Sequence, residues 1–163
     1  MTAFLYGDIM IKLCFVCHGN ICRSPMAEFV MKELVRRAGR EKEFHIVSRA
    51  THTDEIWNGV GSRIYPPAEA MLIKKHIPYD KEKRAVLLEA DDYGKYDLFI
   101  GMDRENMRAM PRILKNDREG KILKLLDFAD GGNVSDPWYT RDFERAFQDI
   151  YKGCEALLNV LTD

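Results

Sequence analysis

The chain has 163 residues, of which 46% are apolar and 31% are charged, and its formal net charge is -1. This length and composition are ordinary for a single globular domain with a substantial core. The small net charge gives no electrostatic reason to expect a nucleic-acid or membrane partner. No apolar run approaches the roughly 18 residues that a membrane helix needs. We expect a cytoplasmic protein that is a monomer or a weak dimer.

The first predicted element is a β-strand in the apolar run 13–16, which a loop and then a helix follow. The loop from Cys17 to Pro25 has the sequence CHGNICRSP, and a helical pattern continues from Met26 to Val35. Gly19 can adopt positive φ, and Pro25 suits the first turn of a helix, where its missing N–H costs nothing. The sequence therefore predicts a strand, a tight loop and a helix in succession.

The spacing of Cys17 and Arg23 predicts an anion-binding site. The five residues between them are enough for the backbone to curl, so that successive N–H groups converge beside the sulfur at a helix N-terminus. Arg23 would grip two oxygens of a phosphate-like anion with its planar guanidinium. The same positive environment favours the thiolate form of Cys17, which is the nucleophile.

The other residues of this loop are predicted to shape and line the site. Asn20 tolerates left-handed backbone geometry and can hydrogen-bond locally, so we expect it to lock the loop. Ser24 is expected to donate a hydrogen bond that stabilises the thiolate. The remaining predicted substrate-binding positions of the loop are His18 at its rim, Gly19, Ile21 and Cys22.

Strands and helices alternate along the rest of the chain. Further strands are predicted at 44–48, 97–100 and 122–126, and helical patterns at 68–76, 89–93, 104–114 and 141–161. Alternation of this kind predicts an α/β three-layer sandwich, in which helices flank a four-stranded parallel sheet on both faces. Ligands of such sheets bind at the carboxyl ends of the strands, where the Cys17 loop falls.

Two structural expectations accompany this pattern. Asp103 precedes the helical pattern 104–114 as a good N-cap, and we expect it to organise a loop rather than to take part in catalysis. Cys14 and Cys154 lie within predicted elements and are expected to be small buried hydrophobes, because four cysteines in a chain of this size do not indicate a disulfide framework.

A second set of candidate catalytic residues is Asp136-Pro137-Trp138-Tyr139. Pro137 limits Asp136 to extended conformations, and a glycine-containing stretch precedes it. An acid beside two aromatic side chains suits a general acid that protonates a departing phenolate while Trp138 and Tyr139 contact the ring.

Both strings closely resemble those of the low-molecular-weight protein tyrosine phosphatases. The resemblance implies hydrolysis of phosphotyrosine and other aryl phosphate monoesters through a phosphocysteine intermediate. Cys17 would be the nucleophile, Arg23 the phosphate clamp and Asp136 the general acid and base. It implies a phosphotyrosyl protein as substrate and neither metal nor cofactor. No set of His, Cys and carboxylate residues here has metal-site spacing.

The resemblance carries three further expectations. The family pattern begins directly after Met10, so residues 1–10 are expected to be a disordered extension and 11–163 a single phosphatase domain. In the family the loop after the second strand forms a cleft wall; Trp57, in the segment 51–67, is the candidate aromatic, unless it packs on the core. The family's pair matching Cys17 and Cys22 implies a redox-sensitive disulfide, unless Cys22 only fills space under the loop.

Two alternatives remain open at this point. A protein arginine phosphatase is a relative with Thr where this chain has Ile21, and Ile21 favours phosphotyrosine. A catalytically weak relative that only binds phospho-ligands is the second alternative, because the segment 48–93 follows the family pattern weakly. The intact Cys17, Arg23 and Asp136 argue against it.

Overall fold

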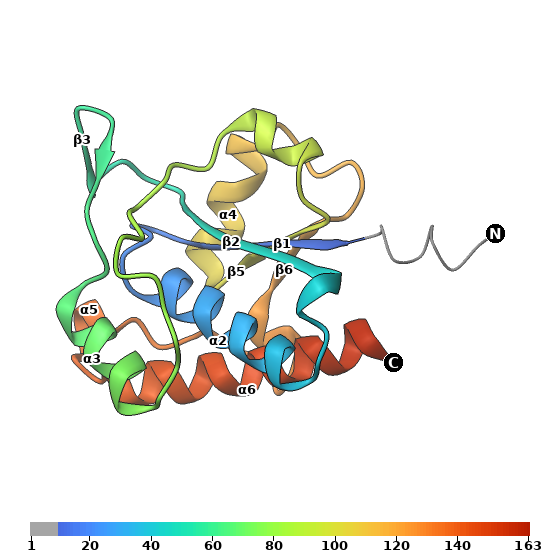
Figure 1. Cartoon of the computed structure of the whole chain (residues 1–163). Helices are drawn as coiled ribbons and strands as arrows, with labels where there is room; N and C mark the ends of the chain where they lie inside the picture. Colours follow the sequence, from blue (N-terminus) through green and yellow to red (C-terminus); the bar gives the residue numbers. More distant parts are fainter. Residues whose placement is uncertain (1–9) are drawn as a thin grey trace.

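Four parallel strands form the central sheet in the order β2-β1-β5-β6. They span Ile11–Cys17 (β1), Phe44–Ala50 (β2), Leu98–Gly101 (β5) and Ile122–Lys124 (β6). The structure is a computed structural model that describes residues 10–163 (Figure 1). Apart from Met10, the expected extension 1–10 lies outside the described residues.

Helices cover both faces of this sheet, as predicted (Figure 1). On one face lie α2 (Arg23–Arg37), α3 (Pro66–Lys74) and α6 (Phe143–Thr162), and on the other lie the 3₁₀ helix η2 (Ala90–Gly94) and α4 (Arg104–Ile113). The shorter elements are the 3₁₀ helices η1 (Glu41–Glu43) and η3 (Leu125–Phe128) and the helix α5 (Pro137–Thr140). The three-layer α/β architecture is therefore confirmed.

The alternation of side chains along β1 explains why both faces need cover. Leu13 and Phe15 belong to the large apolar cluster shared with α2 and α6, whereas Cys14 and Val16 belong to a smaller cluster with residues of η2 and α4. All four are fully buried, which is typical of a central parallel strand. The parallel register pairs Cys17 with Ala50 and Val16 with Gly101, so these strands end at one edge of the sheet.

Several element boundaries differ from those predicted. The strand predicted at 122–126 ends at Lys124, because Leu125 and Leu126 are both buried and the chain turns into η3 to direct both toward the core. The long helix begins at Phe143 rather than at Arg141, whose φ of 62° lies in the left-handed region. α5 was not predicted.

The segment 51–67 also contains secondary structure that was not predicted. It carries a small antiparallel hairpin of β3 (Ile56–Trp57) and β4 (Val60–Gly61). Asn58 and Gly59 form its turn with φ values of 50° and 78°, the geometry that this dipeptide favours in two-residue hairpins. None of the helices between residues 10 and 163 has the length and apolar character needed to cross a membrane.

The contact of α6 with η3 gives a prediction about stability. A Cβ on Gly153 would lie 2.5 Å from Cγ of Leu125, which is fully buried and has no room to withdraw. We therefore expect Gly153→Ala to lower the free energy of unfolding in urea by about 1–3 kcal/mol, although Ala favours helix. Gly94→Ala is the control, because a Cβ there meets no atom within 4 Å. Equal stability of both variants would contradict this packing.

Candidate active site

Cys17 lies at the carboxyl end of β1, in the middle of the sheet, and is 4% exposed. Its sulfur is 3.0 Å from Oγ of Ser24, and the backbone N–H of Ser24 donates to it at 3.4 Å. Asn20, at the turn of the loop, has a φ of 59° and is also buried. The loop 17–23 thus curls between β1 and α2 and directs polar groups at the sulfur.

The chain that follows β2 supports this loop from outside. The N–H groups of Thr51 and His52 donate to the carbonyl oxygens of Cys17 and His18, at 2.9 and 3.0 Å, and the N–H of Tyr65 donates to the carbonyl of Ile21 at 2.8 Å. These bonds satisfy three backbone acceptors of the loop and hold it against the chain that follows β2.

Arg23, at the start of α2, is the charged centre of the site and is 4% exposed. Nη1 donates to Oδ2 of Asp103 at 2.8 Å and to the carbonyl of Val134 at 3.1 Å, and Nη2 lies 3.4 Å from Oδ2 of Asp136. Burial opposes the charged form, but Cys17 and the two carboxylates outweigh it and raise the pKa of Arg23. Asp103 organises this arrangement while it caps α4.

Asp136 approaches the same guanidinium from the opposite wall. It is the N-cap of α5, and its Oδ1 accepts a hydrogen bond from the N–H of Trp138 at 3.0 Å. One third of its side chain is exposed. The carboxylate therefore lies between the buried Arg23 and solvent, where a proton can be exchanged.

These groups surround a pocket of about 350 Å³. It is lined by residues 17–23 of the loop, by Asp54, Glu55, Tyr65, Asp103, Glu105 and Asn106, and by Asp136, Trp138, Tyr139 and Phe143. All the predicted site residues line it except Ser24, which lies beneath the loop against Cys17, and Trp57.

The comparisons with known proteins agree with this geometry. A family model described as low molecular weight phosphotyrosine protein phosphatase matches residues 12–163. The chain belongs to this family. It is 36% identical to a low molecular weight protein-tyrosine-phosphatase, PtpA, of Staphylococcus epidermidis, over 93% of this chain and 94% of PtpA. It is also similar to the crystal structure of SP-PTP, the corresponding phosphatase from Streptococcus pyogenes, with 40% identity, a TM-score of 0.82 and coverage of 94% and 95%.

A more distant structural neighbour has the same fold but is named for a different substrate. The structure of an arginine phosphatase from Drosophila has a TM-score of 0.83 over 94% of this chain and 99% of its own, at 22% identity. This likeness shows the fold alone, because proteins with one fold can carry different activities.

The expected aromatic wall is formed differently from the prediction. Trp57 lies on the β3-β4 hairpin outside the pocket, and 71% of it is exposed. Tyr65, directly before α3, lines the pocket instead and packs against Trp138 with ring centroids 6.0 Å apart. Tyr65 was missed, although an aromatic residue before the pair Pro66-Pro67 marks where the loop returns to a helix.

His18 belongs to a small rim cluster that the sequence did not reveal. Its ring stacks on that of His52 with centroids 4.0 Å apart, and its Nε2 lies 2.9 Å from Oδ2 of Asp54. This hydrogen bond lowers the pKa of Asp54. Asp54 and Glu55 precede β3 and give no local motif, so only the fold identifies them as part of the rim.

The cysteines are all free thiols in this structure. Cys14 and Cys154 are fully buried, as expected for small hydrophobes. Burial raises the pKa of Cys22, and the neighbouring Cys17 raises it further. A disulfide between Cys17 and Cys22 stays a prediction.

The Arg23–Asp103 pair gives a prediction about the stability of the site. Asp103→Ala removes an N-cap and leaves a buried guanidinium without its closest carboxylate, so we expect it to lower the free energy of unfolding by about 2–4 kcal/mol. Asp103→Asn keeps the cap and should lower the free energy of unfolding by about 1 kcal/mol less than Asp103→Ala does. Chemical denaturation in urea measures both values.

The control for this prediction is Asp142, the exposed N-cap of α6, which accepts from the N–H of Arg145 at 2.9 Å. Asp142→Ala removes only a cap, so it should lower the free energy of unfolding by about 1 kcal/mol. If Asp103→Ala costs no more than Asp142→Ala, the Arg23–Asp103 pair contributes nothing to the fold.

Proposed function

We propose that this phosphatase hydrolyses phosphotyrosine in proteins through a phosphocysteine intermediate, with Cys17, Arg23 and Asp136 as its catalytic residues. The observation that carries the proposal is their convergence on one pocket, where Arg23 is next to the loop that holds the sulfur and 3.4 Å from the Asp136 carboxylate. A nucleophile, a charge clamp and a proton donor are the groups that this reaction needs.

In the first step the phosphate group docks in the loop 17–23. The Arg23 guanidinium and the loop N–H groups bind its non-bridging oxygens, and the thiolate of Cys17 attacks phosphorus in line with the tyrosyl oxygen. A sulfur–phosphorus bond forms as the phosphorus–oxygen bond breaks. Asp136 gives its proton to the departing tyrosyl oxygen, which leaves as a neutral phenol.

In the second step water attacks the phosphocysteine. Asp136, now a carboxylate, accepts a proton from this water as the oxygen–phosphorus bond forms. The sulfur leaves as a thiolate, which the Ser24 hydroxyl stabilises from its position 3.0 Å away. Inorganic phosphate is released, and the enzyme returns to its starting charge state.

The walls of the pocket support an aromatic phosphate ester as the substrate. Tyr65 and Trp138 provide adjacent ring surfaces, and Tyr139 extends them to solvent. Aromatic rings pack favourably on the ring of a tyrosine. Ile21 adds a hydrophobic contact from the loop. This apolar surface suits a phenyl ring better than the polar guanidinium of a phosphoarginine.

The catalytic roles predict how activity depends on the leaving group. After EDTA treatment, Cys17→Ser should abolish hydrolysis of a phosphotyrosine peptide. Asp136→Ala should lower kcat for the phosphotyrosine peptide by a factor of about 10²–10⁴. It should lower kcat for p-nitrophenyl phosphate much less, because p-nitrophenolate leaves without a proton. Asp91→Ala is the control, since Asp91 is exposed and outside the pocket.

Three results would contradict this reaction. Equal losses with both substrates in Asp136→Ala would remove the role of Asp136 as general acid. Preferential hydrolysis of a phosphoarginine peptide by the parent protein would replace the phosphotyrosine activity with the arginine phosphatase alternative. A parent protein that binds phosphate but hydrolyses neither peptide would be a phospho-ligand binder.

The two exposed tryptophans give a separate prediction about the substrate surface. Trp138→Ala should raise KM for a phosphotyrosine peptide about three- to tenfold, the size expected for losing an aromatic contact. Trp57→Ala should change KM by less than about twofold, because Trp57 does not line the pocket. Steady-state kinetics on both variants measures the difference, and a larger effect of Trp57→Ala would restore it as the wall of the cleft.

A further inference from the structure

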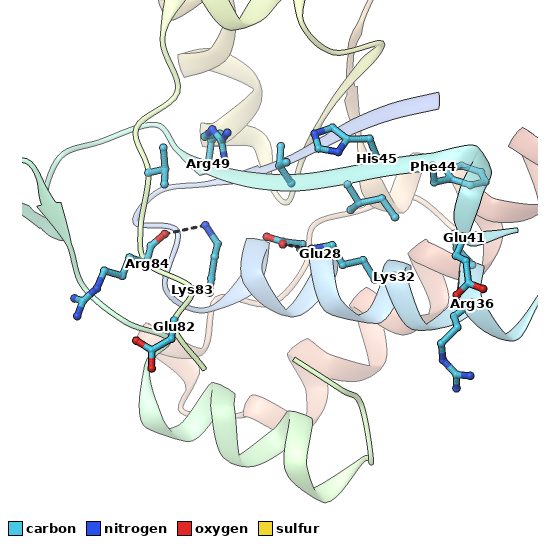
Figure 2. Close-up of a pocket in the computed structure, with 14 residues that line it drawn as sticks. Glu28, Lys32, Arg36, Glu41, Phe44, His45, Arg49, Glu82, Lys83 and Arg84 are labelled. Carbon is cyan, nitrogen blue, oxygen red and sulfur yellow. Dashed lines mark hydrogen bonds and ion pairs between the residues drawn. The ribbon is translucent and has the colours of Figure 1, made fainter. Parts of the chain in front are cut away.

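The segment between α3 and η2 supplies a charged group to the loop that holds Cys17. A groove of about 730 Å³ runs beside β2, between that strand, α2 and residues 82–86. Figure 2 shows Lys83 and Glu28 on the α2 side of β2, whereas Arg49 and His45 lie on its other side. Among the residues that line the groove, Lys83 and Val86 also contact the active-site loop.

The Lys83 ammonium donates to three carbonyl oxygens. Nζ is 3.0 Å from Oδ1 of Asn20 and 3.4 Å from the carbonyl of Ser48. It is 2.8 Å from the carbonyl of Arg84, the bond drawn in Figure 2. An ammonium has three protons to donate and no acceptor, so these contacts use its full capacity. Lys83 is therefore held in place by its own hydrogen bonds.

Lys83 fixes which way the Asn20 side chain faces. Oδ1 of Asn20 accepts from Lys83 and from the N–H of Val86, at 3.0 Å each. Two donors on one side require the carbonyl oxygen there, so the amide nitrogen has to face the other way. It donates to Oγ of Ser24 at 2.7 Å. The positive charge of Lys83 also polarises this amide and strengthens the second bond.

The orientation of Asn20 in turn fixes the hydroxyl of Ser24. Because Oγ accepts from Asn20, the hydroxyl proton of Ser24 is free to point at the sulfur of Cys17, 3.0 Å away. Three successive hydrogen bonds thus connect the Lys83 ammonium to the nucleophile, over 66 positions of sequence. We propose that Lys83 is a positioning residue for the reaction, which holds Asn20 and Ser24 so that the thiolate of Cys17 is stabilised.

The charges around this network are mixed, and they identify which group to change. Burial lowers the pKa of Lys83; Glu28 and Cys14 oppose this shift, while Arg49 and Lys32 add to it. The charged or titratable groups on the active-site side are Cys17, His18, Cys22, Arg23, Asp54, Glu55, Tyr65, Asp103, Glu105, Asp136 and Tyr139. Lys83 is distinct among these cations because it donates directly to the loop.

The test measures the reactivity of Cys17 without turnover. Iodoacetamide is neutral and alkylates the thiolate, and peptide mapping assigns the label to Cys17. The ratio of its rates at pH 6 and pH 9 should fall about three- to tenfold in Lys83→Met, the size expected for losing one hydrogen bond of this network. Lys81→Met, at an exposed neighbour, should leave the ratio unchanged. An unchanged ratio in Lys83→Met would overturn the proposal.

A second background separates positioning from a general effect of charge. In Ser24→Ala the last bond of the network is absent, so adding Lys83→Met should lower the ratio no further. An equal loss in this background would show that Lys83 acts on Cys17 by another route and would overturn the proposal. If Lys83→Met does not fold cooperatively, Lys83→Gln takes its place; its amide keeps a donor without the charge and should lower the ratio by a smaller factor, whereas no loss would overturn the proposal.

This inference rests on the proposed function in one respect: Cys17 is taken as the nucleophile that attacks the phosphate ester. If alkylation follows the predicted pattern but phosphotyrosine is not hydrolysed, the proposed function fails while the network stands. If phosphotyrosine is hydrolysed and the alkylation ratio is unchanged, the role of Lys83 fails alone.

Discussion

A buried guanidinium that must remain paired is the constraint on which this site depends. Arg23 is almost fully buried, and an unpaired charge in that position would be strongly destabilising. Its partners come from the start of α4, from the carbonyl of Val134 and from Asp136, 80, 111 and 113 positions away in the chain. The need to satisfy one side chain therefore draws two loops, the one before α4 and the one before α5, to the carboxyl end of the sheet.

The partners of Arg23 differ in a way that suits binding of a phosphate monoester. Asp103 is close, at 2.8 Å, and is held by its reciprocal cap with Asn106, whereas Asp136 is at 3.4 Å and one third exposed. The first contact fixes the plane of the guanidinium. The second leaves Nη2 weakly engaged, so an incoming phosphate oxygen can take its place without removing the buried support.

Features that depend on residues close together in the sequence could be predicted, whereas features that depend on distant partners could not. The strand, loop and helix around Cys17 depend on neighbouring residues and were predicted closely. Trp57 lies on a hairpin that was not predicted, so its place outside the pocket could not be foreseen from the sequence. Lys83 and Asp54 have no local signal at all: their partners Asn20 and His18 lie 63 and 36 positions away. The candidate catalytic residues could be named from motifs, but the residues that contact them could be identified only from the fold.

The helix N-termini show how this chain keeps backbone donors available at one place. α4, α5 and α6 begin with Asp103, Asp136 and Asp142, each of which accepts from an N–H of its own helix. α3 begins with two prolines, which have no N–H to offer. α2 begins after Cys22, with no side-chain cap and no acidic residue in its first turn.

A missing cap costs a helix about 1 kcal/mol, and α2 is the helix that contacts both β1 and α6. An Asp at its start would recover that stability, but its carboxylate would occupy the same amide groups and would repel a phosphate dianion. The absence of an acid there is therefore a requirement of anion binding. The polar groups around the sulfur are uncharged instead: Ser24 contacts it directly, and Asn20 contacts Ser24, so no carboxylate is placed beside it through these bonds.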